Sequence, residues 1–210
     1  MTSAPSNALD VIRGQGVVAI VRARTADDAA STVDALLEAG IRAVEVSLVT
    51  PNALDVVRAA AAAAPDDVAV GVGTVLSVND VTAAVTAGAR FIVAPAFDAS
   101  VVQAAIAAGI DVLPGVATPT EAVTAVAAGA TAVKVFPASL WSPAVLREVR
   151  TALPWLTTVP TGGVSLETAP EWIRAGAAAV GIGSALTGSA NPGATAARLL
   201  DAIHDARTGT

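Results

Sequence analysis

The chain contains a single lysine, Lys134, which lies in the apolar segment Ala132-Val133-Lys134-Val135-Phe136. On a β-strand, Lys134 projects to the face opposite Val133 and Val135. If these valines pack against outer helices, the lysine points into the interior, where loss of water favours the neutral amine and lowers the pKa. A neutral amine can attack a carbonyl carbon and form a Schiff base. A buried structural ion pair with a carboxylate is the alternative.

Glu45 is the second charged residue in an apolar strand pattern, Ala43-Val44-Glu45-Val46-Ser47-Leu48. Val44, Val46 and Leu48 form the apolar face, so Glu45 shares the inner face with Ala43 and Ser47. A buried carboxylate must be paired or functional, because burying it alone is costly. Beside an amine, Glu45 would move protons as a general acid and base. A structural ion pair stays open for this residue too.

Two glycine-rich segments form a third candidate for chemistry. They are Thr161-Gly162-Gly163-Val164 and Gly181-Ile182-Gly183-Ser184-Ala185. Glycines let backbone N–H groups approach an anion, and a short helix starting at Ser184 would add its positive end. Paired glycines are also common in tight turns, so only the two segments together indicate a phosphate site.

A repeated Ala-Gly pattern predicts the elements that would hold these residues. It occurs at Gly40, Gly88, Gly109, Gly129 and Gly176, so the intervals correspond to one or two units of about 20 to 24 residues. Such a unit is a helix that ends at a left-handed glycine and is followed at once by a strand. The Pro65 and Pro154 regions break the helix in the two double-length intervals.

The pattern predicts one α/β domain over residues 1–210, a (β/α)₈ TIM barrel with a short N-terminal helix at Ala8–Arg13 that Gly14 ends. Helices are predicted, for example, at Asp27–Ala39, Asn79–Ala87 and Thr120–Ala128. An open doubly wound sheet would need a glycine-rich fingerprint after the first strand, and none is present. In a barrel the active site lies at the carboxyl ends of the strands. The predicted strands are Val17–Val21, Ala43–Leu48, Val68–Val72, Phe91–Ala94, Asp111–Leu113, Ala132–Val135, Thr157–Pro160 and Ala179–Ile182.

Composition restricts the class of protein. The absence of cysteine excludes disulfides and thiolate ligands, and the only histidine, His204, is expected to be a solvated helix residue, so we expect no metal and no cofactor. The net charge of −6 has no basic clusters, which argues against nucleic acid or an anionic membrane as partner. No apolar run reaches the ~18 residues of a membrane span, and no signal peptide is recognisable. A cytoplasmic protein acting on small molecules is expected.

The sequence resembles the family of 2-keto-3-deoxy-6-phosphogluconate (KDPG) and 2-keto-4-hydroxyglutarate (KHG) aldolases, including the related 6-phosphogalactonate aldolases. The resemblance covers about residues 17–186. Its motifs, in chain order, are Val18-Ala19-Ile20-Val21-Arg22-Ala23, Val44-Glu45-Val46, Gly71-Val72-Gly73-Thr74-Val75-Leu76, Leu113-Pro114-Gly115-Val116-Ala117-Thr118-Pro119-Thr120-Glu121, Lys134-Val135-Phe136-Pro137, Pro160-Thr161-Gly162-Gly163 and Gly181-Ile182-Gly183-Ser184.

The resemblance implies a metal-independent class I aldolase, usually a homotrimer, that acts on a 2-keto acid and an aldehyde phosphate. It implies Lys134 as the Schiff-base lysine and Glu45 as the proton shuttle. Around them it implies a keto-acid pocket lined by Thr74 and Pro95, with Phe136 packed on it and Thr161 in contact with the substrate. It also implies a phosphate site formed by Gly162, Gly163, Gly183 and Ser184.

One departure from the family pattern affects the substrate. Many 6-phosphogluconate enzymes have Glu-Val-Thr-Leu-Arg-Thr where this chain has Val49 in place of the arginine, which helps to hold the substrate carboxylate. Arg22 matches an arginine of other branches of the family and is predicted to supply this charge. The 6-phosphogluconate is the first expectation, with the 6-phosphogalactonate and the hydroxyglutarate as alternatives. A phosphate-binding barrel isomerase or epimerase and a non-catalytic sugar-phosphate binder or trimeric assembly protein are alternatives of other classes.

Overall fold

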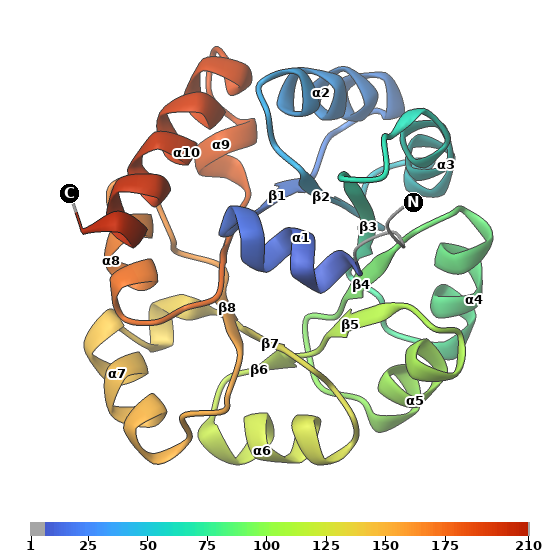
Figure 1. Ribbon diagram of the computed structural model, residues 1–210. Helices are drawn as coiled ribbons and strands as arrows, with labels where there is room; N and C mark the ends of the chain where they lie inside the picture. Colours follow the sequence, from blue (N-terminus) through green and yellow to red (C-terminus); the bar gives the residue numbers. More distant parts are fainter. Residues whose placement is uncertain (1–6, 210) are drawn as a thin grey trace, which may run out of the picture.

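The computed structural model describes residues 7–209, and in these the strands form a ring that the helices surround (Figure 1). The strands are β1 (Val17–Val21), β2 (Ala43–Ser47), β3 (Ala69–Gly73), β4 (Phe91–Val93), β5 (Asp111–Leu113), β6 (Gly115–Val116), β7 (Val133–Val135), β8 (Thr158–Pro160) and β9 (Val180–Ile182).

Helices follow the strands around the outside of the ring. The first part of the chain contributes α1 (Ala8–Gln15), α2 (Ala26–Glu38), α3 (Ala53–Ala63), α4 (Val78–Thr86) and α5 (Ala99–Ala107). The second part contributes α6 (Pro119–Ala127), the 3₁₀ helix η1 (Ala138–Leu140), α7 (Pro143–Ala152), α8 (Ala169–Arg174), α9 (Ser184–Thr187) and α10 (Pro192–Thr208).

All strand pairs are parallel, and they form two arcs in the orders β5-β4-β3-β2-β1-β9 and β6-β7-β8. The single bridge between Thr161 and Gly181 joins β8 to β9. The opposite ends of the two arcs are β5 and β6. Pro114 interrupts one strand position there and divides it into these two strands. Counted this way, the described residues contain eight strand positions, and the predicted TIM barrel is confirmed.

The glycines of the Ala-Gly repeat end helices in the left-handed conformation, as predicted. All five repeat glycines have positive φ, from 72° at Gly109 to 107° at Gly129, a region that other residues rarely adopt. The helix starts are fixed by side-chain caps, since Thr25, Ser77 and Thr118 each accept a hydrogen bond from a backbone N–H of the first turn. The α2, α4 and α6 helices therefore begin one residue earlier than predicted.

Side chains of the strands alternate between two apolar cores. Outward residues such as Val44, Val46 and Val133 pack with the helices in one large cluster. Inward residues such as Val18, Phe91 and Leu113 form a smaller cluster, which Leu9 and Ile12 of α1 close at the amino end. Figure 1 shows α1 lying across that end of the ring. The inner cluster leaves the carboxyl ends of the strands for polar residues.

Several predicted bounds are wrong by a residue or two. The N-terminal helix continues past Gly14 to Gln15 and ends at Gly16, which takes the left-handed conformation with φ 86°. Gly14 has ordinary backbone angles and does not end the helix. The prediction also omitted β6, because Pro114 has no N–H and suggested the end of the fifth strand.

No helix within residues 7–209 is both long enough and apolar enough to cross a membrane. His204 lies on α10 and is exposed, as predicted.

Candidate active site

Lys134 and Glu45 line the same small cavity at the centre of the ring, although they are 89 positions apart in the sequence. Lys134 lies on β7 and is 6% exposed, and Glu45 lies on β2 and is 2% exposed. The cavity measures about 10 Å³, which is close to the space of one water molecule. The other lining residues are Val18, Ile20, Val93, Leu113, Val159, Thr161 and Gly181.

The neighbours of the two charged residues explain this orientation. Val133, Val44 and Val46 lie in the outer core against the helices, which turns Lys134 and Glu45 inward. No ion pair within 4.0 Å forms between Lys134 and Glu45, and neither side chain makes a hydrogen bond to any group in residues 7–209. The structural ion pair that the sequence left open is therefore not formed. The Lys134 ammonium lies 4.7 Å from the centre of the Phe136 ring.

Burial moves the pKa values of both groups toward each other. It lowers the pKa of Lys134, and the positive charge of Arg22 lowers it further, while the charge of Glu45 acts in the opposite direction. Burial also raises the pKa of Glu45, against the smaller lowering effects of Lys134 and Arg22. The site thus favours a neutral amine next to a carboxyl group that can hold a proton, because desolvation penalises both charged forms.

Two glycines on neighbouring strands make room for the polar side chains. A Cβ on Gly73 would overlap the Glu45 carboxylate, and a Cβ on Gly181 would overlap the Thr161 hydroxyl. Since all other residues carry a Cβ, only glycine allows these side chains to lie flat against the adjacent strand. The glycines of these family motifs are thus explained by close packing inside the ring.

The structure brings some of the predicted pocket residues to the cavity. Thr161 lines it directly and is buried, with its hydroxyl donating to the Val159 carbonyl at 3.1 Å. Thr74 follows Gly73, the last residue of β3, and the Glu45 carboxylate lies against Gly73. Pro95 follows β4 and its backbone packs where a Cβ on Gly115 would lie, but it does not line the cavity.

The two glycine-rich loops lie next to each other at the carboxyl ends of β8 and β9. Gly162 and Gly163 have φ values of 83° and 88°, and Ser184 begins the short helix α9 as predicted. The backbone N–H groups of Gly162, Gly163, Gly183 and Ser184 donate to no acceptor within residues 7–209. These loops thus hold a group of unused donors, the arrangement that binds phosphate at such loops in barrels.

Arg22 and Val49 follow β1 and β2 at the same end of the ring. Arg22 is exposed, and its charge acts on both Lys134 and Glu45. Its guanidinium makes no ion pair or hydrogen bond with the described part of the chain. Val49 is 58% exposed and brings no charge to this rim.

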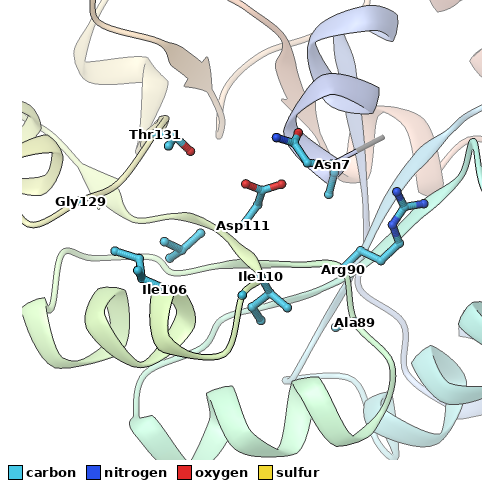
Figure 2. A pocket seen from close by; sticks show the side chains of 11 residues that line it. Asn7, Ala89, Arg90, Ile106, Ile110, Asp111, Gly129 and Thr131 are labelled. Carbon is cyan, nitrogen blue, oxygen red and sulfur yellow. The ribbon is translucent and has the colours of Figure 1, made fainter. Parts of the chain in front are cut away.

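A larger cavity of about 600 Å³ lies at the opposite, amino end of the strands (Figure 2). Asn7, Arg90, Asp111 and Thr131 line it, and the Asp111 carboxylate accepts a hydrogen bond from the Leu9 N–H at 2.9 Å. This contact fixes the start of α1. None of the residues predicted for the active site lines this cavity.

Residues 7–209 contain no group of three or more His, Cys, Asp or Glu that could hold a metal ion.

Two buried residues with hydroxyl groups lie near the site, and the sequence predicted no role for them. Ser47 bonds to Thr74 at 2.7 Å, and the Thr50 hydroxyl accepts the Ala23 N–H at 3.2 Å. The alternation along β2 placed Ser47 on the inner face, but only the fold reveals its partner.

Known proteins are similar to this chain in both sequence and architecture. The family model for KDPG and KHG aldolases matches residues 9–196. A 2-dehydro-3-deoxy-6-phosphogalactonate aldolase of Escherichia coli strain K12 is 39% identical over 171 residues, which cover 81% of this chain and 83% of the relative.

Solved structures agree with the family match. A cube-shaped protein cage, designed by fusing symmetric oligomeric domains, superposes with a TM-score of 0.87 at 35% identity and covers 92% of this chain and 74% of that one. A KDPG aldolase from Legionella pneumophila, with pyruvate captured as a covalent carbinolamine, superposes with a TM-score of 0.81 at 26% identity, over 94% and 97% of the two chains. With a family match over most of its length, this chain belongs to the KDPG and KHG aldolases and is a carbon–carbon lyase.

Proposed function

We propose that this chain is a class I aldolase that cleaves a 2-keto-3-deoxy-6-phospho sugar acid into pyruvate and glyceraldehyde 3-phosphate, through a Schiff base at Lys134. One observation carries the proposal: a lysine and a carboxyl group, with no ion pair to either in the described part of the chain, line one buried cavity inside the ring of strands. A barrel isomerase or a sugar-phosphate binder needs no such lysine, and the family match favours the aldolase.

The reaction follows from the two side chains. The neutral Lys134 amine attacks the C2 ketone of the substrate, and Glu45 donates the proton with which the hydroxyl of the carbinolamine leaves as water. The iminium then accepts the electron pair of the C3–C4 bond as that bond breaks, while the C4 hydroxyl proton passes to a base. Glyceraldehyde 3-phosphate departs. The enamine is protonated at C3, and water hydrolyses the iminium to release pyruvate and restore the lysine.

The family match does not identify which sugar acid the enzyme prefers. The sequence predicts the 6-phosphogluconate as the first expectation, and this stays a prediction. The 39% identity to a 6-phosphogalactonate aldolase supports the galactonate isomer instead, and the neutral Val49 agrees with a departure from the gluconate pattern. We therefore propose the 6-phosphogalactonate as substrate. Side-by-side cleavage assays of the two isomers test this, and a higher kcat/KM for the gluconate would contradict it.

The phosphate group of the substrate is assigned to the loops after β8 and β9. Their four unused N–H donors support this, because backbone N–H groups bind phosphate oxygens without a charged side chain. By the same family likeness, we propose that residues 1–210 form one aldolase domain that assembles as a homotrimer. The symmetric oligomeric domains of the designed cage support the oligomer. Light scattering of the purified protein would test it.

Ser184→Asp is expected to weaken binding of phosphorylated substrates by at least tenfold in KM. The new carboxylate would lie at the start of α9, beside the unused N–H donors, and would repel the substrate phosphate there. Turnover of the unphosphorylated 2-keto-4-hydroxyglutarate is expected to change much less. Ser184→Asn, of similar size without the charge, is the control. Equal losses for both kinds of substrate would contradict the phosphate assignment.

Arg22→Ala is expected to raise the KM for every 2-keto acid, pyruvate included, by about tenfold, the effect of losing a hydrogen bond to a charged group. Arg22 lowers the pKa of Lys134, so its loss also moves the pH optimum upward, and KM is compared at the optimum of each variant. Arg24→Ala removes an exposed arginine two residues away and serves as control. An unchanged KM would remove Arg22 from the carboxylate site and leave the carboxylate to the groups near Gly73 and Thr74 alone.

A further inference from the structure

Thr74 adopts a backbone conformation that threonine rarely takes. Its φ is 63°, and within residues 7–209 only Asn52 is another non-glycine residue with positive φ. A β-branched side chain crowds the backbone in this region, so the conformation is strained. Such a conformation persists only if surrounding contacts hold it.

Ser47 provides such a contact from the neighbouring strand. Its hydroxyl lies 2.7 Å from the Thr74 hydroxyl, and Ser47 is completely buried. Parallel pairing places Ser47 opposite Gly73, and the Leu48 N–H donates to the Gly73 carbonyl at 2.8 Å. Ser47 also lies two residues after Glu45, on the same inner face of β2. The start of the turn after β3 is therefore attached to the strand that carries Glu45.

The conformation of Thr74 leaves donors unused at the end of β3. The Thr74 backbone N–H donates to no acceptor within the described residues. Either hydroxyl of the Ser47–Thr74 pair can be the donor. A carboxylate accepts hydrogen bonds only, so a carboxylate at Thr74 would accept a hydrogen bond from the Thr74 hydroxyl, and Ser47 would then donate to the Thr74 oxygen.

We propose that Ser47 is a positioning residue for the keto-acid carboxylate: it donates to Thr74 and holds the Thr74 hydroxyl and N–H toward the substrate. The proposal rests on the aldolase function proposed above. Ser47 acts through Thr74 and touches neither the substrate nor Lys134. It gives the site a neutral carboxylate anchor that does not depend on an arginine at position 49.

The test titrates Schiff-base formation with two ketones, one with a charged carboxylate and one in which a methyl ester removes that charge. Pyruvate carries the carboxylate, and its methyl ester does not. Each is incubated with enzyme and cyanoborohydride, which reduces the iminium, and the fraction of modified chains is measured by mass spectrometry. Ser47→Ala is expected to raise the half-saturating pyruvate concentration about fivefold to tenfold, the effect of one hydrogen bond. The value for methyl pyruvate is expected to stay within twofold of wild type.

Two further variants separate positioning from general damage. Thr74→Val removes the hydroxyl through which Ser47 acts, so adding Ser47→Ala to it is expected to produce little further loss of pyruvate binding. Thr158→Val removes another buried strand hydroxyl, one with no hydrogen-bond partner among residues 7–209, and is expected to leave both titrations unchanged.

The possible outcomes are distinct. Wild-type titrations for both ketones in Ser47→Ala would overturn the positioning role, as would equal weakening for pyruvate and its ester. Full additivity of Ser47→Ala and Thr74→Val would overturn the route through Thr74. If the wild-type protein itself traps neither ketone, the aldolase proposal fails, independently of Ser47.

Discussion

Pyruvate and borohydride are expected to add one reduced pyruvate per chain to the wild-type protein, at Lys134. Burial lowers the pKa of this lysine, which leaves more of the neutral amine that attacks a ketone. Lys134 is the only lysine in the chain, and the α-amino group is the only other primary amine. Peptide mapping by mass spectrometry therefore identifies the modified site without ambiguity.

Lys134→Arg is expected to abolish both trapping and aldol cleavage. Arginine keeps the positive charge and most of the volume, but it does not deprotonate at accessible pH. The fold is expected to survive, which circular dichroism and a thermal melt would check. EDTA is expected to leave the wild-type rate unchanged, because a Schiff base replaces the metal as electron sink. Cleavage retained in Lys134→Arg, or no trapping in wild type, would show that the Schiff-base assignment is wrong.

Glu45→Gln is expected to slow turnover by about 10²–10⁴, the usual range for a lost general acid or base. The amide has nearly the same shape as the carboxyl group and keeps its place beside Gly73, so the fold and the ability to capture pyruvate are expected to remain. Burial raises the pKa of Glu45, which lets the wild-type side chain give and take protons, whereas the amide can do neither. The measurement is kcat for cleavage together with the extent of pyruvate trapping.

The control for this variant is Glu38→Gln, on the exposed surface of α2, which is expected to retain wild-type kcat. Loss of Glu45 also removes a charge that raises the pKa of Lys134, so more of the amine is neutral in the variant. A slower turnover then cannot come from a protonated lysine. Wild-type turnover in Glu45→Gln would reduce Glu45 to a structural residue.

Local signals in the sequence were sufficient for most of the fold. The positive φ of Gly40, Gly88 and Gly129 follows from helix geometry, because a helix that ends in the left-handed conformation favours glycine. The inward direction of Lys134 and Glu45 follows from strand alternation, which needs only the neighbouring valines. Periodicity does not fix where an element begins or ends, so the sequence predicts a helix end at Gly14, whereas Gly16 provides the cap.

The contents of the site depended on contacts between distant residues. The sequence suggested an ion pair as one possible state of Lys134 and Glu45, and only the packed ring separates the two groups beyond 4.0 Å and encloses a cavity between them. The Pro95 backbone packs over Gly115, a contact between two strands that the sequence does not show, and its place in the keto-acid pocket stays a prediction. The division of one strand position into β5 and β6 at Pro114 likewise depends on distant contacts, because β5 pairs with β4 and β6 pairs with β7.

By itself, the sequence determined the βα repeat, the class of barrel, the single inward lysine and the family, because backbone geometry and strand alternation act over a few residues. The tertiary structure alone decided that Ser47 bonds to Thr74, that the N–H groups of two loops share one rim, and that Glu45 lies over Gly73. These contacts join residues from different strands. Their geometry depends on register and ring closure, which arise only when all the strands pack together.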